Sequence, residues 1–570
     1  MLLGQTPMKL PALLFRSRVI VARGLATIGA VMGFVVYAQT PATRPAAPAR
    51  APEPPRLVVF LVVDQFRGDY VQWYGQHWTK GLRRLFDNGA VFPLAAYPYA
   101  GTVTCPGHFT IGTGLLPATH GMVGNNWYDA TANRLTLCSS DPTATSVPFG
   151  GGTGTEHHSP RALLAPAFAD ELRLQEKRAP QILSVSLKPR SAIGLGGHGG
   201  PGTIILWEED SGVWATSDAF TKTPWPAVDE YVRAHPITAS YGQTWTKLLP
   251  ESSYLFEDDA PGEAQPAPWT RTFPHEFKTP SGKADNVYVS AWERSPLSDA
   301  YIADMVINLV ATMKLGQKPG TDMLAVSFSA LDLVGHEYGP RSHEVQDVMA
   351  RLDIQIGRLL DTLDRLVGPT HYTLAFSADH GSAPLPEQAI ALGMDAGRVS
   401  LTEIRDAVQK TATSVLGEGT YYGSFAEENV YLTAGTLQKL MTKPAAITGI
   451  KDALGRIKGI ARVYAPDELS STAPTDDPIL RSVRMSYRPG RSGDFVVIPK
   501  PYWVLRGTGT THGTPYAYDQ HVPVLFFGAG IKPGRYLVPA SPVDIAPTLA
   551  AITGIALART DGQVLNMAIR

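Results

Sequence analysis

Four short segments of the chain are continuously apolar and lack the alternation of a half-exposed strand. They are residues 57–63 (LVVFLVV), 323–331 (MLAVSFSAL), 372–378 (YTLAFSA) and 521–528 (HVPVLFFG). Continuous apolar character is typical of strands that are buried on both faces, as in a parallel sheet covered by helices. We therefore expect these segments to form the centre of such a sheet.

Apolar residues with helical spacing lie between the second and third of these segments. Ser342 is placed to cap this helix, apolar positions recur across 345–366, and Gly368 can end it. Further helices are expected over 296–315 and 545–552. A strand, a helix and a strand in this order form a parallel unit. The sequence thus predicts an α/β fold, with a mostly parallel central sheet flanked by helices.

Two long stretches, about 139–295 and about 382–510, lack this alternation of strand and helix signals. The first is rich in Gly, Pro and Trp, and the second mixes helical and loop signals. We expect both to be insertions into a single domain that spans residues 57–570.

The N-terminal residues 1–38 have the features of a signal peptide. Three arginines (Arg16, Arg18 and Arg23) precede the apolar run 24–37, which ends next to Ala38 in a small-residue cleavage pattern. The run is shorter than the ~20 residues of a membrane-spanning helix, so we expect no stable membrane insertion. An uncleaved anchor is the alternative. The Pro/Ala-rich residues 39–56 are expected to be an extended linker.

The charges of the chain nearly balance, with 50 basic and 51 acidic residues and a net charge of −1. No global field attracts nucleic acid or an anionic membrane, so we expect no nucleic acid as a specific partner. Any recognition of an anion must be local. The two cysteines, Cys105 and Cys138, are too few for a disulfide framework, although an exported chain could pair them. The sequence leaves this pairing and the oligomeric state open.

Carboxylate and imidazole side chains lie near the ends of the apolar segments. Each alone is more often a helix cap or a hydrogen-bonded side chain. Ligands bind beyond the carboxyl ends of parallel strands, so we expect the residues after the first three segments to meet in one crevice. Their oxygen and nitrogen atoms are ligands that zinc accepts. The candidates are Asp64, Asp332, His336, Asp379, His380 and His512.

Five sequence blocks resemble the alkaline phosphatase superfamily, in the branch shared with nucleotide pyrophosphatases and phosphodiesterases. The blocks are VVDQFRGDY, TVTCPGHFTIGTGLLPATHGMVGNNWYD, LDLVGHEYG, SADHG and THGTPYAYDQHVPVLFFG. Within this branch the chain is most similar to periplasmic alkaline phosphatases that use a threonine nucleophile. The resemblance implies two zinc ions, one bound by Asp332, His336 and His512, and the other by Asp64, Asp379, His380 and the Thr104 oxygen.

The resemblance also implies that Thr104 attacks the phosphate ester and forms a covalent phosphothreonine. Two metals about 4 Å apart would stabilise the attacking and the leaving oxygen, and a water would then release inorganic phosphate. From the residues alone, Thr102, Cys105 and Thr110 are rivals of Thr104. A thiolate would tend to bind zinc tightly, however, and the run from Cys105 (CPGHF) lacks the C-x-P-x-R pattern of sulfatases in this superfamily.

Three further residues match positions that contact the phosphate group in the similar monoesterases: Asn125, Lys188 and Arg190. A phosphate monoester carries two negative charges, so its non-bridging oxygens need hydrogen-bond donors and positive charge. Asn126 is the alternative to Asn125 as the phosphate contact. For Lys188 and Arg190, the alternative is that they form a solvated pair on the surface. Other histidines in the blocks are expected to be structural or to orient metal-bound groups: His108, His120 and His521.

The sequence therefore predicts an exported, zinc-dependent phosphomonoesterase that acts on small-molecule phosphate esters. A phosphodiesterase or nucleotide pyrophosphatase on the same two-zinc site is the first alternative. The others are a zinc- or phosphate-binding protein without catalysis, and a cofactor-independent mutase, which an export signal disfavours. Manganese at the same ligands also remains open.

Overall fold

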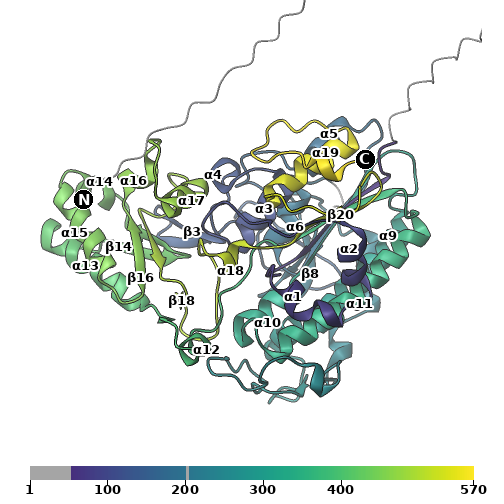
Figure 1. Ribbon diagram of the computed structural model, residues 1–570, viewed down its shortest axis with the longest axis horizontal. Coiled ribbons are helices and arrows are strands. Elements are labelled where there is room, and N and C mark those ends of the chain that lie inside the picture. Colours follow the sequence, from purple (N-terminus) through teal and green to yellow (C-terminus); the bar gives the residue numbers. More distant parts are fainter. Residues whose placement is uncertain (1–52, 201–203) are drawn as a thin grey trace, which may run out of the picture. The chain divides into compact units, whose positions relative to one another are not determined.

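The computed structural model describes residues 53–200 and 204–570 of the chain (Figure 1). The predicted signal peptide and most of the predicted linker lie outside the described residues. Among the helices of the described part, none has both the length and the apolar character needed to cross a membrane.

A ten-stranded sheet lies at the centre of the fold (Figure 1). Five adjacent strands in its middle are parallel, and Leu57 at the start of β1 pairs with Asp322 on one side and Tyr372 on the other. This confirms the predicted mostly parallel sheet. In order across the sheet, the strands are β20 (Gly534–Arg535), β2 (Ala90–Phe92), β19 (Val524–Gly528), β12 (Tyr372–Ser377), β1 (Leu57–Val63), β11 (Asp322–Phe328), β6 (Ile182–Ser186), β7 (Ile204–Glu208), β8 (Val213–Ser217) and β5 (Ser146–Pro148).

The four apolar segments all supply strands of this sheet, with two differences from the expectation. The second segment ends its strand at Phe328, because Ala330 already begins helix α10 (Ala330–Tyr338). The fourth supplies β19, which runs antiparallel to β12. An apolar run shows that a strand is buried but carries no information on its direction, so the sequence could not predict this reversal.

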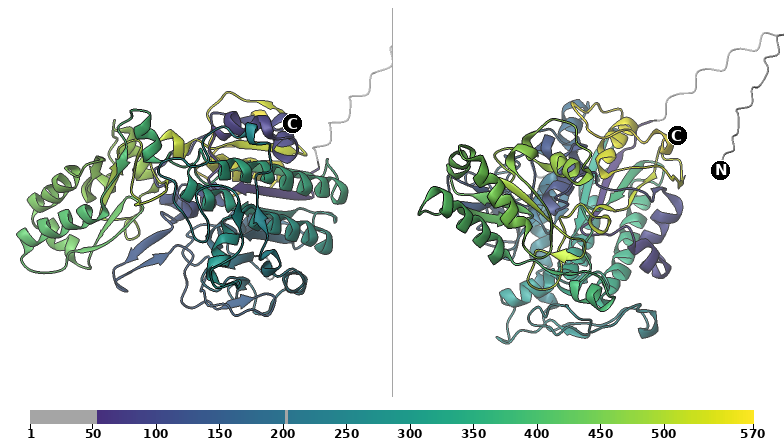
Figure 2. Two further views of the ribbon diagram at one scale, coloured as in Figure 1. Left: turned by 90° about the horizontal axis from the view of Figure 1, so that it is seen from below. Right: turned by 60° about the vertical axis from the view of Figure 1, so that its left-hand side comes forward.

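Helices cover both faces of the sheet (Figure 2). Alternate residues of β1, from Leu57 to Val63, pack into one apolar core with α9 (Pro296–Met313) and α11 (His343–Leu366). The intervening residues pack into a second core with α5 (Phe168–Gln175) and α19 (Ile545–Thr553). The three predicted helices therefore form, and the Ser342 hydroxyl caps α11 by accepting a hydrogen bond from the Val345 amide.

The two stretches that were expected to be insertions differ from each other. Residues 139–295 contain β5, β6, β7 and β8 of the central sheet, so this part of the stretch belongs to the main core. Residues 382–510 contain a separate four-stranded sheet, whose apolar core extends from Val399 to Trp503. We call residues 397–504 the inserted subdomain. Its sheet consists of β14 (Tyr422–Ala426), β15 (Asn429–Leu432), β17 (Phe495–Pro499) and β16 (Ile460–Tyr464).

Candidate active site

The predicted ligand residues follow the carboxyl ends of three adjacent parallel strands. Asp64 comes directly after β1, and Asp379 and His380 come shortly after β12. Asp332 lies in the first turn of α10, which follows β11, and His336 lies one turn further along that helix. The pairing of β12, β1 and β11 in this order brings these side chains together. The loop before α18 (Ala517–Gln520) adds His512.

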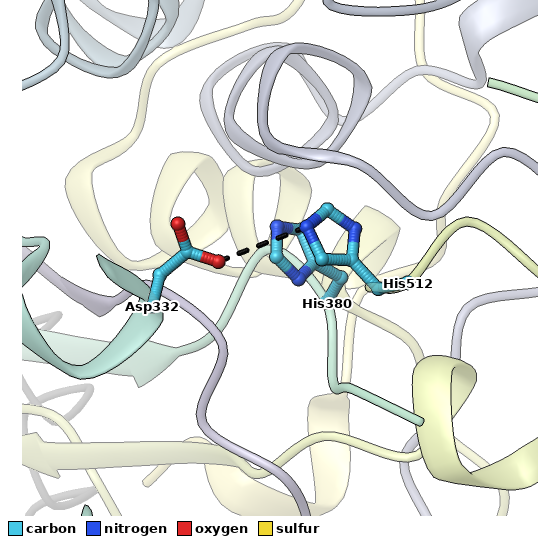
Figure 3. A group of neighbouring side chains, drawn as sticks. All are labelled: Asp332, His380 and His512. Carbon is cyan, nitrogen blue, oxygen red and sulfur yellow. Dashed lines mark ion pairs between the residues drawn. The ribbon is translucent and has the colours of Figure 1, made fainter. Parts of the chain in front are cut away.

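Two groups of these side chains are close enough to hold a metal ion. In each group, one potential ligand atom per residue lies within 4.8 Å of the others. The first group is Asp64, Asp379 and His380, and the second is Asp332, His380 and His512. Figure 3 shows the carboxylate of Asp332 facing the imidazoles of His380 and His512. These two rings are stacked, with their centroids 3.5 Å apart.

His336 lies beside the second group rather than within it. Its Nε2 atom is 3.3 Å from Oδ1 of Asp332, and its ring centroid is 5.0 Å from that of His512. The predicted set was Asp332, His336 and His512. The group defined by distance contains His380 in place of His336, and His380 thus belongs to both groups. All six predicted side chains nevertheless meet in one place.

The three histidines share an orientation that suits metal binding. The Nδ1 atoms of His336, His380 and His512 each lie 2.9 Å from a backbone carbonyl oxygen, which they can contact only as donors. The acceptors belong to Thr510, Gly381 and Thr102. With Nδ1 held by a carbonyl oxygen, Nε2 is the ring nitrogen left facing the carboxylates. Metal-binding histidines are commonly fixed in this way through their other ring nitrogen.

The carboxylates of the site are buried close to one another and share one ammonium group. Asp64 is fully buried, and neither of its oxygens accepts a hydrogen bond from a described residue. Its ammonium partner is Lys188, whose Nζ lies 2.7 Å from Oδ2 and also pairs with Asp332. One ammonium group is thus shared between two carboxylates. Closely spaced oxygen and imidazole donors fit a divalent cation such as zinc.

The pKa values of the group reflect this crowding. Burial, and then repulsion from Asp332 and Asp379, raises the pKa of Asp64 well above its ordinary value. Burial also opposes ionisation of Asp332, but attraction to His336 and Lys188 holds the pKa of that carboxyl below its usual range. Burial would lower the pKa of His380, yet Asp379 outweighs it and raises the pKa to about 9. A bound cation would relieve the repulsion between the carboxylates.

Thr104 is the first residue of helix α3 (Thr104–Thr113) and is buried. Its hydroxyl oxygen lies 3.4 Å from Nε2 of His380, the atom that also faces Asp64 and Asp379. His108, one turn along α3, lies 2.9 Å from the Thr104 carbonyl through Nδ1 and 3.2 Å from Oδ2 of Asp379. The hydroxyl thus lies where a helix N-terminus, which favours anions, meets the first ligand group.

Asn125 is held next to Thr104. Its Oδ1 atom accepts a hydrogen bond of 2.8 Å from the amide of Cys105, and its Nδ2 atom, the donor end of the side chain, lies near the carboxylate of Glu427. Cys105 and Cys138 form a disulfide, and the Cys138 amide donates to the Asn125 carbonyl. The pairing that the sequence left open is therefore present. Asn126, by contrast, begins strand β3 (Asn126–Asp129) and pairs with Leu137.

The two basic residues have different surroundings. Lys188 is buried and is held by Asp64 and Asp332. Arg190 is half-buried, and its guanidinium forms no hydrogen bond or ion pair with a residue that the structure describes. This cation is attracted electrostatically to Glu427 and retains hydrogen-bond donors that can bind an anion.

Two residues at the site were missed by the sequence analysis. Gln65 follows Asp64, has a positive φ of 65°, and donates through Nε2 to Asp332 at 2.6 Å. Its position next to a ligand in a recognised block was a usable signal. Glu427 of the inserted subdomain accepts a hydrogen bond from the Asn125 amide. No sequence pattern pointed to it.

Comparisons with known proteins agree with this geometry. The profile of the family "Type I phosphodiesterase / nucleotide pyrophosphatase" matches residues 58–521. Alkaline phosphatase PhoV of Synechococcus elongatus is 30% identical over 519 residues, which cover 88% of this chain and 90% of that protein. A protein of Myroides odoratus named calcium-transporting ATPase is also 30% identical, with coverage of 88% and 92%.

The crystal structure of alkaline phosphatase PafA is similar throughout. It aligns with a TM-score of 0.83 at 29% identity and covers 91% of this chain and 100% of that chain. PafA is a protein of Elizabethkingia meningoseptica. A PafA variant with a threonine, an asparagine, a lysine and an arginine replaced gives the same TM-score at 28% identity. The family profile and the similar proteins agree with the sheet and the ligand groups described above. The chain therefore belongs to the type I phosphodiesterase/nucleotide pyrophosphatase family of the alkaline phosphatase superfamily.

Proposed function

We propose that this protein is an exported alkaline phosphatase that hydrolyses small-molecule phosphate monoesters through a phosphorylated Thr104. The observation that carries the proposal is the position of the Thr104 hydroxyl, buried at the start of α3 and 3.4 Å from His380. His380 belongs to both groups of potential metal ligands. A hydroxyl so placed can act as a nucleophile toward a phosphate bound at the same groups.

The residues proposed to hold two zinc ions are those of the sequence prediction. One set is Asp332, His336 and His512, and the other is Asp64, Asp379 and His380 with the Thr104 oxygen. Bound zinc supplies Lewis acidity, which activates a hydroxyl and stabilises a leaving alkoxide at neutral pH. The proposal of zinc rests on the mixture of carboxylate and imidazole donors, and manganese is the alternative at the same ligands.

The proposed substrate contacts come from Asn125, Lys188 and Arg190. Nδ2 is the donor end of the Asn125 side chain, because Oδ1 is already bonded to the Cys105 amide. Arg190 has no hydrogen-bonded or ion-paired partner among the described residues, and Lys188 lies between the two ligand groups. Two cations and an amide suit the dianionic phosphate of a monoester. The PafA variant noted above is altered at the same four residue types as Thr104 and these three residues, in the same order.

Export is supported by two features of the chain. The N-terminal residues 1–38 have the pattern of a signal peptide. Cys105 and Cys138 form a disulfide in the structure, and disulfides persist mainly in oxidising compartments such as the periplasm or the cell exterior. We therefore propose a periplasmic or secreted location.

Replacement of the nucleophile tests the proposed mechanism. We expect Thr104→Ala to lower kcat/KM for an aryl phosphate monoester at least about 1,000-fold, since the covalent step is lost. Thr104→Ser keeps a hydroxyl and is the matched control, which should retain far more activity and give an acid-stable phosphoenzyme. Metal content should stay the same in both variants. Near-normal turnover by the alanine variant would show that Thr104 is not the nucleophile.

A phosphodiesterase activity is the second candidate, because the family profile is named for it. The two functions are separated by the ratio of kcat/KM for an aryl phosphate monoester to that for the corresponding diester. We expect a strong preference for the monoester. A preference for the diester would favour the second candidate and leave the nucleophile assignment intact.

A further inference from the structure

A hairpin of the inserted subdomain ends in an unusual turn beside the candidate active site. Ala426 of β14 pairs with Asn429 of β15, so Glu427 and Glu428 form a two-residue turn. Their φ angles are 47° and 61°. Such a turn favours Asn-Gly, because both central residues need positive φ. Two glutamates in this conformation are strained, and strain of this kind is concentrated at functional sites.

The first of these glutamates binds the backbone of Asn125. The amide of Asn125 lies 2.9 Å from Oε2 and 3.2 Å from Oε1 of Glu427. Gly124 makes this approach possible, because a Cβ atom there would lie 2.5 Å from Oε2. The contact joins two residues that are 302 positions apart in the chain.

Asn125 is therefore held at three points. Glu427 binds its amide, the amide of Cys138 donates to its carbonyl, and the amide of Cys105 donates to its side-chain oxygen. Cys105 follows the proposed nucleophile, Thr104. These bonds fix where the Nδ2 atom of Asn125 lies relative to the Thr104 hydroxyl.

Glu427 also faces the cation of the site. Burial raises the pKa of Glu427 to about 7, and the backbone amide of Asn125, the charge of Arg190 and the side chain of Asn125 oppose that rise. Arg190 has no hydrogen-bonded or ion-paired partner among the described residues. The same carboxylate thus lies near two of the three residues proposed to bind the phosphate.

We propose that Glu427 is a positioning residue, which holds Asn125 so that its side-chain amide donates to a non-bridging oxygen of the phosphate. Through this turn the inserted subdomain contributes to recognition of the monoester. The inference rests on the proposed role of Asn125 and adds a residue that acts through it.

Three variants at this turn test the proposal. Glu427→Ala removes the acceptor and should lower kcat/KM for an aryl phosphate monoester about tenfold, with a change of less than about twofold for the diester. Glu427→Gln keeps an oxygen acceptor for the Asn125 amide and should stay within about twofold of wild type for both substrates. Glu428→Gly relieves the strain at the neighbouring position, keeps Glu427, and is the control for effects of the turn itself.

A double-mutant cycle separates positioning from a general structural role. If Glu427 acts through Asn125, Glu427→Ala should have no further effect on kcat/KM in an Asn125→Ala background. The proposal would be overturned if Glu427→Ala lowered kcat/KM equally in the wild-type and Asn125→Ala backgrounds. It would also be overturned if the variant lost equal activity toward monoester and diester, or if Glu427→Gln were as impaired as Glu427→Ala. Thermal unfolding of each variant identifies a loss of fold, and if the Ala variant is unfolded the cycle is run with Glu427→Gly.

The cycle also distinguishes this inference from the proposed function. If wild-type protein prefers the diester, the proposed monoesterase function is wrong. The coupling between Glu427 and Asn125 is then measured with the diester as substrate. Coupling on that substrate would support the positioning role of Glu427 even though the protein is not a monoesterase. Absence of coupling on the preferred substrate would overturn the positioning role alone.

Discussion

Lys188 and Arg190 are two residues apart, yet their surroundings predict different consequences of substitution. Arg190→Ala removes an unpaired guanidinium, so we expect at least about tenfold lower kcat/KM for monoesters and an unchanged unfolding temperature. Lys188→Ala also leaves Asp64 and Asp332 without their shared ammonium. In chelator-treated protein this should cost about 3 kcal/mol of stability, measured by urea unfolding. Equal unfolding curves for the two variants would contradict the difference.

Glu263 is a buried acid far in sequence from these residues, and it predicts a pH dependence of stability. Burial raises its pKa from 4.5 to about 8, and Asp258 and Asp259 add to the rise. The folded protein binds this proton more tightly than the unfolded chain does. Stability should therefore fall as the pH rises from 4.5 to about 8, by at most about 1.4 kcal/mol per pH unit.

Glu263→Gln should remove this contribution, because the amide does not ionise. Urea unfolding at several values between pH 5 and pH 9 checks it. The variant should have a flatter profile than wild type and should be the more stable protein at pH 9. Parallel profiles would show that Glu263 is not the group responsible.

Residues of the site could be predicted from the sequence where they lie within a short sequence block. They could not be predicted where they reach the site through a long-range contact. Asp379 and His380 are adjacent in the chain and come just after a buried strand, so their common position at the site could be predicted from the sequence. Glu427 contacts Asn125 across 302 positions, from a subdomain that had no recognised motif. A contact of this kind depends on the packing of two units, and no local pattern encodes it.

At the scale of elements, helix α3 packs closely against Asp379, which lies just beyond the end of strand β12. A Cβ atom at Gly107 would lie 2.3 Å from the carbonyl oxygen of Asp379 and 2.6 Å from its Cβ. Gly107→Ala should therefore displace α3, and with it Thr104, from the ligand residues. We expect a loss of about 1–3 kcal/mol of stability and at least about tenfold lower kcat/KM.

Gly455→Ala is the matched control for that prediction. Gly455 is the last residue of helix α15 (Pro444–Gly455), and a Cβ atom there would meet no atom within 4 Å. This substitution should be neutral or stabilise the protein by up to about 1 kcal/mol, with activity unchanged. If Gly107→Ala behaved like the control, the close packing of α3 on Asp379 would not constrain the site.

The elements themselves differ in how well the sequence predicted them. The 24-residue helix α11 has a long apolar periodicity and a capping serine, and it begins directly after Ser342 as expected. Strands β6, β7 and β8 have five residues each and lie in a Gly- and Pro-rich stretch. So short a run gives little periodic signal, and these strands were assigned to an insertion. Their place in the sheet follows from pairing with β11 and with one another.

At the scale of the whole molecule, the ligand groups join parts of the chain that are distant in sequence. Asp64, Asp332 and Asp379 follow β1, β11 and β12, which are neighbours at the centre of the sheet. Repulsion among these buried carboxylates opposes folding when no cation is bound. Metal binding should therefore stabilise the entire fold and not only the loops that carry the ligands.

Chelation tests this link between metal and fold. After removal of metal we expect no phosphatase activity and a lower unfolding temperature, since a ligand at 100 times its Kd adds about 2.7 kcal/mol of stability. Two equivalents of zinc should restore both, and manganese added instead shows whether the donor set selects between the ions. Protein that was verified to be metal-free, yet kept its unfolding temperature, would show that the carboxylates are neutralised by Lys188 and the histidines alone. Activity in that protein would rule out a metal-dependent reaction, so the two measurements separate the structural from the catalytic role of the site.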